Sequence, residues 1–111
     1  GVSYGSNSDY RLKENVEPLT GALLKIQLLK PSTYNYITYP GTRVSGFIAH
    51  ELQNIVPEAV CGEKDAVDEE GNPEHQTVDL SKVVPLLTAA LQEAIAKIET
   101  LEAKVAALEA Q

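Results

Sequence analysis

The sequence predicts an α+β protein: a small helix and strand domain with a protruding acidic loop, followed by a long C-terminal helix that forms a parallel coiled coil. Three observations support this fold class. Short segments with helical or alternating periodicity fill residues 14–60, an acidic stretch with glycines follows at 60–74, and a heptad repeat of apolar residues begins at Val84. The compact part, about seventy residues, is marginal for a self-sufficient core, so we expect the chain to oligomerise.

The composition argues against several classes of partner. The 111 residues include 16 acidic and 9 basic ones, a net charge of -7, and neither Lys nor Arg forms a cluster. We therefore expect no nucleic-acid partner and no membrane partner, and no apolar run approaches the ~18 residues of a membrane span. Cys61 is the only cysteine, so an intrachain disulfide and a thiolate zinc cluster are both excluded.

The first helix is expected over residues 14–29, after a Gly/Ser-rich linker at residues 1–7. Lys30-Pro31 supplies the stop signal. The apolar residues that recur at helical spacing are Leu19, Leu23, Ile26 and Leu29.

Two strands and a short helix are expected next. Residues 32–37 and 43–48 are predicted to be strands, joined by a turn at residues 39–42. A short helix over residues 49–56 follows, and Pro57 ends it.

Residues 60–74 are expected to form a hairpin or protruding loop with its turn at residues 70–73. The chain then returns as a short strand over residues 76–80. Asp79 or Ser81 is the expected cap of the last helix.

The last helix carries the strongest structural pattern in the chain. In its heptad register Lys97 and Lys104 fall at g positions, and Glu102 and Glu109 fall at e positions. Opposite charges at the g–e contacts favour a parallel, in-register homo-oligomer, while the pattern leaves two or three strands open. The a and d residues of this seam are Val84, Leu87, Leu91, Ala94, Ile98, Leu101, Val105 and Leu108.

Several residues that could carry chemistry lack a supporting pattern. Cys61 has no base nearby in sequence and is expected to be a small buried side chain. His50 and His75 do not have the spacing of a metal motif, and the acidic loop lacks the ligand order of a calcium loop. We therefore expect no metal and no cofactor.

Ser8 and Lys13 are a possible nucleophile and base. A serine hydroxyl needs a base to remove its proton, and a neutral lysine can serve as that base. Side chains five residues apart do not stack on a regular helix, so these two would meet only if Ser8 lies in a turn that leads to Lys13. From this chemistry alone, a solvated turn is the commoner explanation of such a spacing.

Three blocks in a fixed order resemble one known family. The blocks are SDYRLKENVEPL, GFIAHELQNIVPEAV and VDLSKVVPLLTAALQEAIAKIETLEAKV. Together they resemble the intramolecular chaperone auto-processing domain at the C-terminus of phage tailspikes, tail fibres and endosialidases, to which a domain of animal myelin regulatory factor is related. The resemblance covers residues 8 to about 105 and implies a chaperone that trimerises, helps an upstream stalk to fold, and then cuts itself off.

The resemblance also implies a domain organisation and a site. Residues 1–7 would be the remnant of the upstream stalk, residues 8–80 the chaperone core, and residues 81–111 the trimerisation helix. The chain would be a single-turnover serine endopeptidase that cuts between Asn7 and Ser8, with Ser8 as nucleophile and Lys13 as general base. The other two charged residues of the motif, which have no assigned role, are Asp9 and Arg11.

The implied partners are two further copies of the chain and the upstream stalk of the same polypeptide. The implied location is a virion tail precursor assembled in the host cytoplasm, with the cleaved domain released from the mature fibre. Two alternatives stay open: a trimerisation and folding module that does not cleave, and a receptor-binding fibre tip. Whether the dyad acts within one chain or between chains is also open.

Overall fold

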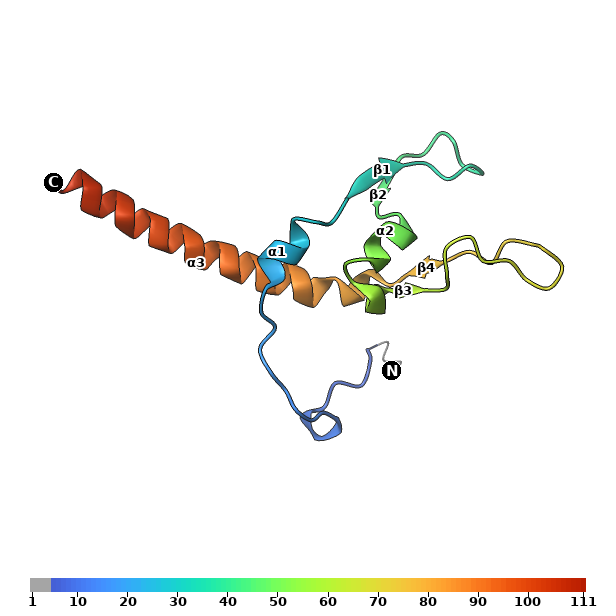
Figure 1. Ribbon diagram of the computed structural model, residues 1–111, viewed down its shortest axis with the longest axis horizontal. Helices are drawn as coiled ribbons and strands as arrows, with labels where there is room; N and C mark the ends of the chain where they lie inside the picture. The colour runs from blue at the N-terminus through green and yellow to red at the C-terminus, as the bar shows by residue number, and fades with distance from the viewer. Residues whose placement is uncertain (1–4) are drawn as a thin grey trace.

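The computed structural model describes residues 5–111, so residues 1–4 of the expected linker lie outside the described residues. A small helix and strand domain lies at one end of α3, and α3 extends far beyond it (Figure 1). The molecule measures 72 × 42 × 31 Å with a radius of gyration of 19.9 Å, against roughly 13 Å for a compact chain of this length. The elements are η1 (Tyr10–Leu12), α1 (Ala22–Ile26), β1 (Ser32–Tyr34), β2 (Val44–Gly46), α2 (Ala49–Gln53), η2 (Pro57–Ala59), β3 (Val60–Cys61), β4 (Thr77–Val78), η3 (Leu80–Lys82) and α3 (Val84–Glu109).

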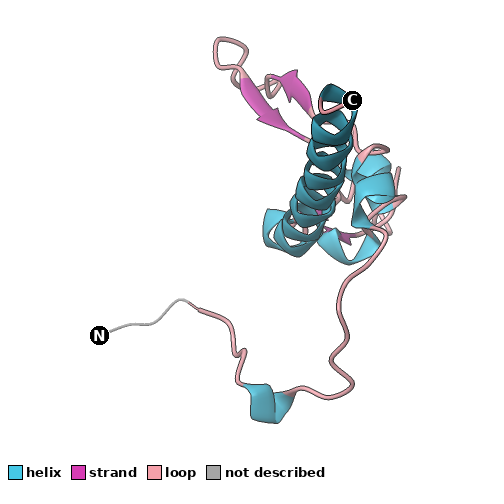
Figure 2. Ribbon diagram, turned by 90° about the vertical axis from the view of Figure 1, so that its left-hand side faces the viewer, coloured by secondary structure: helices cyan, strands magenta, loops and turns pink. Residues whose placement is uncertain are grey.

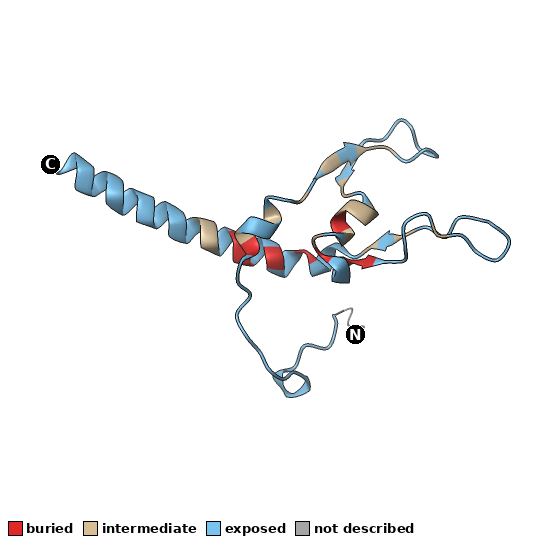
Figure 3. Ribbon diagram, viewed as in Figure 1, coloured by how far each residue is buried: buried red, intermediate tan, exposed pale blue. Residues whose placement is uncertain are grey.

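The hydrophobic core is small and lies where α1, α2 and η2 pack around the first turns of α3 (Figure 3). Only one of its large side chains, Leu52, is fully buried. A core built largely from alanine and valine removes little apolar surface from water. The buried residues are Ala22, Leu52, Val56, Ala59, Val60, Val83, Leu86, Ala89 and Ala90.

Glu93, on α3, links this helix to the start of α1 by hydrogen bonds. Its carboxylate accepts hydrogen bonds from the backbone N–H groups of Leu23 at 2.7 Å and Ala22 at 3.1 Å. These donors are otherwise unpaired because they belong to the first turn of a helix. Together they hold the pKa of Glu93 below its ordinary value.

Replacing Glu93 with glutamine should lower the melting temperature at pH 7 by several degrees, because a glutamine offers one acceptor oxygen where the carboxylate offers two. The folded pKa is lowered, so this stabilisation is present above the ordinary value of 4.5 and is lost as the pH falls through the lower folded value. Thermal unfolding of both proteins at one concentration, from pH 7 down to pH 3, should show the two curves converging. Glu99→Gln, on the exposed part of α3, is the control and should leave the melting temperature unchanged.

The first helix is shorter than the sequence predicts. The prediction of a helix over residues 14–29 is wrong for its first part, since α1 begins only at Ala22. Pro18 disfavours a helical conformation in the residue before it and lacks an N–H group. Gly21, with φ of +70°, then sets the start of α1, and Asn15 also has a positive φ of 52°. The helix also ends three residues before the predicted end, so only Leu23 and Ile26 of the predicted apolar face lie in α1.

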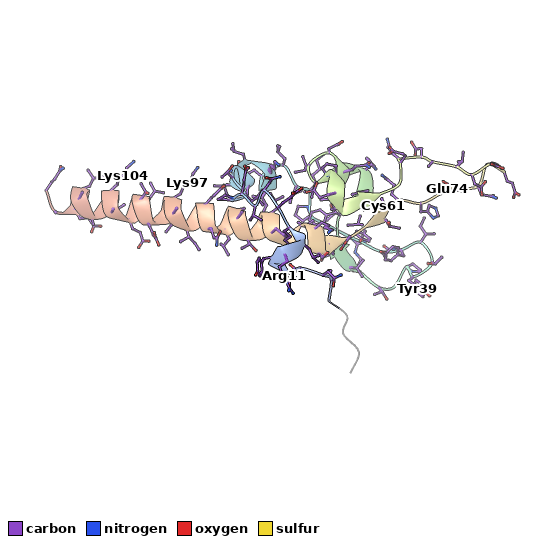
Figure 4. The ribbon with its side chains drawn as sticks, turned by 90° about the horizontal axis from the view of Figure 1, so that it is seen from below. Arg11, Tyr39, Cys61, Glu74, Lys97 and Lys104 are labelled. Carbon is purple, nitrogen blue, oxygen red and sulfur yellow. The ribbon has the colours of Figure 1, made fainter. Side chains whose placement is uncertain are left out.

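The two predicted hairpins are present as antiparallel pairs. β1 pairs with β2 with Thr33 opposite Ser45, and β3 pairs with β4 with Val60 opposite Val78. The strands are shorter than predicted, and both hairpins end in protruding loops, on which Figure 4 labels Tyr39 and Glu74.

The turn of the acidic hairpin lies two residues earlier than predicted. The N–H of Gly71 donates to the carbonyl of Asp68 at 3.0 Å, so the turn spans residues 68–71 and not 70–73. The Asp68 carboxylate accepts the backbone N–H groups of Glu70 and Asn72, which closes this turn. Val67 and Pro73 form a bridge behind it.

Helix α3 begins at Val84 and not at residue 81. Asp79 caps the short η3 turn through the N–H of Ser81 at 3.1 Å, and Pro85 stands in the first turn of α3. With 26 residues α3 is the longest element, about 39 Å by its rise per residue.

Helix α3 has two distinct apolar faces. Its intramolecular face packs on the domain through Leu86, Ala89 and Ala90. The heptad seam lies on the adjacent face, where its residues other than Ala94 remain 45% to 68% exposed. The domain therefore covers one face of the helix and leaves the seam free.

Candidate active site

The expected dyad lies on an extended segment, residues 5–20, which we call the N-terminal arm. Figure 2 shows that the arm extends away from the body of the domain, with η1 at the part of the arm farthest from the body. No hydrogen bond joins residues 5–20 to residues 21–111. Its large apolar side chains are exposed, Tyr10 to 82% and Val16 to 81%. Nothing in the described chain covers this surface.

Ser8 and Lys13 meet across the η1 turn. The Nζ atom of Lys13 donates a hydrogen bond to the Oγ atom of Ser8 at 2.5 Å. The turn is closed by backbone bonds from the N–H of Leu12 to the carbonyl of Asp9 at 3.0 Å and from the N–H of Lys13 to the carbonyl of Tyr10 at 3.1 Å. A single tight turn thus joins two side chains that a regular helix would keep apart.

Asp9 and Arg11 form the turn itself. The Oδ1 atom of Asp9 accepts the backbone N–H of Arg11 at 2.8 Å and its Nε–H at 3.0 Å, and Oδ2 accepts from Nη2 at 2.9 Å. The Arg11 side chain, followed by its backbone N–H, lowers the pKa of Asp9, and the Asp9 carboxylate raises the pKa of Arg11. The two residues without an assigned role therefore hold each other as an ion pair beside the dyad.

The dyad opens into a hollow of about 700 Å³ between the N-terminal arm and the body. Asn7, Ser8 and Lys13 line the arm side. The body side contains the charged residues Glu58 and Lys82 and the apolar residues Val56 and Leu86. The bond expected to be cut thus borders a space large enough for solvent and reacting groups. The remaining lining residues are Ser6, Leu19, Lys25, Ile55, Ser81 and Pro85.

The sequence did not indicate that Glu58, Ser81 and Lys82 lie near the dyad. These residues are 45 or more positions from Lys13, and only the packing of η2 and η3 brings them to the hollow. No local pattern in the sequence could have assigned them to it.

The other candidate residues lie elsewhere. The expectation that Cys61 is buried is wrong: Cys61 is exposed (Figure 4), because alternate residues of β3 face opposite sides and Val60 takes the core side. His50 and His75 line one small hollow at the base of the acidic loop. Within residues 5–111, no three His, Cys, Asp or Glu side chains gather as they would around a metal ion. The helices of this part of the chain are all too short or too polar to span a membrane.

Comparison with known proteins assigns part of the chain to a family. Residues 8–61 match the model of a peptidase family described as the chaperone of endosialidase. Residues 8–61 belong to this family. The match begins at Ser8 and therefore includes both members of the dyad, η1, and the domain through β3.

The chain also has relatives among tail fibre proteins. The chain is 33% identical over 102 residues to the long tail fiber protein Gp37 of Enterobacteria phage K3, and equally to that of Enterobacteria phage T2. These alignments cover 88% of this chain but only 8% and 7% of the two fibre proteins. The chain thus spans a small fraction of the relatives that it matches.

Proposed function

We propose that this chain is the C-terminal intramolecular chaperone of a phage tail fibre or tailspike, and that it releases itself by cutting the bond between Asn7 and Ser8. The observation that carries the proposal is the 2.5 Å contact between Lys13 Nζ and Ser8 Oγ, at the point where the family match begins. The fibre proteins among its relatives support the role in a virion tail. In this proposal residues 1–7 are the remnant of the stalk, residues 8–80 the chaperone core and residues 81–111 the trimerisation helix.

In the proposed chemistry, Ser8 is the nucleophile that attacks the peptide bond on its N-terminal side. A neutral Lys13 takes the Ser8 hydroxyl proton, and Oγ attacks the carbonyl carbon of Asn7. The C–N bond then breaks, the nitrogen of Ser8 receives the proton, and Asn7 is left as an ester on Oγ. Water hydrolyses the ester to a carboxylate at Asn7 and restores the hydroxyl of Ser8, now the first residue of the released chain.

The proposed chemistry requires a neutral amine at Lys13, because a lysine acts as a base only when it has lost its ammonium proton. Both side chains are exposed in the single chain. Cover from neighbouring chains would remove water from the arm, and loss of water favours the uncharged amine. Cleavage would then follow assembly.

The proposed assembly is a parallel homotrimer along α3. Its support is the seam that the domain leaves exposed, together with the lysines and glutamates at g and e. Figure 4 labels Lys97 and Lys104 on the part of α3 that projects beyond the domain. Three chains would bury the seam and add the apolar contact that the small core lacks. Loss of the trimerisation helix after cleavage would make the assembled stalk slow to dissociate.

The test is a time course of the chain expressed behind its native stalk. We expect the full-length band to be replaced by stalk and by a fragment whose N-terminal residue is Ser8, as read by mass spectrometry. A trimeric chain with no change in size would point to a folding module without protease activity. A fragment that begins at another residue would refute the assignment of the scissile bond.

A further inference from the structure

The ion pair of Asp9 and Arg11 lies within the turn that carries the dyad and adds to the backbone hydrogen bonds that close it. All three of its contacts are 3.0 Å or shorter, and two of them join the guanidinium to both oxygens of the carboxylate. Such a two-point contact fixes direction as well as distance. Figure 4 labels Arg11 on η1, in the N-terminal arm.

This pair is poorly placed to stabilise the fold. The side chains of Arg11 and Asp9 are 74% and 42% exposed, and exposed ion pairs add little to stability. The arm also makes no hydrogen bond to residues 21–111. The pair lies between Ser8 and Lys13 in the chain, within the turn that brings these two side chains together.

We propose that Asp9 and Arg11 are positioning residues for the dyad: their ion pair holds Ser8 Oγ against Lys13 Nζ, and each cancels the charge that the other would exert on Lys13. This inference rests on the proposed function, since it concerns the reaction of that same site. It assigns a role to the two residues of the motif that the chemistry of Ser8 and Lys13 does not use.

The charge part of the proposal follows from what surrounds Lys13. Glu14 is its neighbour in the arm, and Lys25, Glu58 and Lys82 line the hollow from α1, η2 and η3. A bare carboxylate at Asp9 would favour the ammonium form of Lys13, and a bare guanidinium at Arg11 would favour the neutral amine. In the ion pair these two opposite effects offset each other.

The experiment measures the rate of fragment release against pH for the full polypeptide with its stalk. Arg11→Ala should slow release about 10- to 100-fold, in line with the cost of a small misplacement of a catalytic group, and should move the pH of half-maximal release upward. Asp9→Asn keeps a side-chain acceptor for the N–H of Arg11 but removes the negative charge, so it should move that pH downward. Arg11→Lys keeps the positive charge but lacks the two-point contact. Its pH profile should therefore come closer to that of the parent than its rate of release does.

The control breaks another ion pair, one formed by residues outside the arm. Lys30→Ala removes the contact between Lys30 and Glu51, which lie 3.8 Å apart, and should leave the rate and its pH profile unchanged. Every variant should keep the oligomeric mass and melting temperature of the parent, because the arm adds little to the fold.

The outcomes separate this inference from the proposed function. If the parent releases no fragment that begins at Ser8, the proposed function fails. If the parent cleaves, and Arg11→Ala and Asp9→Asn match its rate and pH profile, the positioning role is overturned. If both variants release the fragment more slowly but keep the parent's pH of half-maximal release, the charge role is overturned. If either variant no longer forms the oligomer, the ion pair acts in assembly and not in positioning the dyad.

Discussion

Replacing Ser8 with alanine should stop release of the C-terminal domain completely, because no ester can form without the hydroxyl oxygen. Replacing Lys13 with alanine should slow release about 10²- to 10⁴-fold, the usual contribution of a general base. Both effects follow from the contact between Lys13 Nζ and Ser8 Oγ. The measurement is the fraction of full-length chain over time, with the stalk attached, on a denaturing gel.

Matched variants separate catalysis from assembly. Lys13→Arg keeps the positive charge but cannot lose its proton at neutral pH, so it should be as slow as Lys13→Ala. Ser45→Ala, at an exposed serine on β2, should cleave at the parental rate. All four variants should keep the oligomeric mass of the parent. Parental rates of release in Lys13→Ala or Lys13→Arg would contradict the dyad.

Replacing Leu101 with aspartate should dissociate the proposed trimer. Leu101 is a d residue of the seam and is 59% exposed in the single chain, so its burial would come from neighbouring chains. The variant would place three carboxylates on the axis of the coil, and each buried, unpaired charge costs several kcal/mol. At 1.4 kcal/mol per tenfold change, the dissociation constant should rise roughly a thousandfold or more. Sedimentation or light scattering at micromolar concentration measures the mass directly.

Ala103→Asp is the matched control for this prediction. It introduces the same carboxylate two residues away, at an f position that the seam does not include. This variant should remain assembled and should still cleave. If the Leu101→Asp variant forms a trimer as stable as that of the parent, the seam has no role in assembly. If the variant dissociates but still cleaves at the parental rate, cleavage does not depend on assembly.

Local patterns in the sequence correctly predicted the elements whose signals are themselves local. The long helical run of α3 and the two hairpins depend on spacing within a few residues, and the structure has both. The helix that the apolar spacing predicts at residues 14–20 is absent, because Pro18 and Gly21 disfavour a helical backbone there. The backbone preferences of those two residues win where no packing partner supports a helix.

The features that the sequence could not supply depend on contacts between distant residues. Glu93 bonds to the start of α1 across 70 and 71 positions, and Cys61 is exposed because Val60 takes the core side of a two-residue strand. The hollow beside the dyad has walls from the arm, η2, η3 and α3. None of these can be deduced from spacing along the chain.

The sequence by itself determined where α3 runs and which of its residues form an apolar seam, because both follow from a periodicity within one helix. It also placed Ser8 and Lys13 as the pair to test, through the order of three blocks that resemble one family. Only the tertiary structure decided which face of α3 is used within the chain and which is left exposed. It also brings the side chains of Ser8 and Lys13 within hydrogen-bond distance. The physical reason is that an apolar stripe on a helix indicates only that this face must be buried. Which part of the protein buries it depends on how α1, α2 and η2 pack against the same helix.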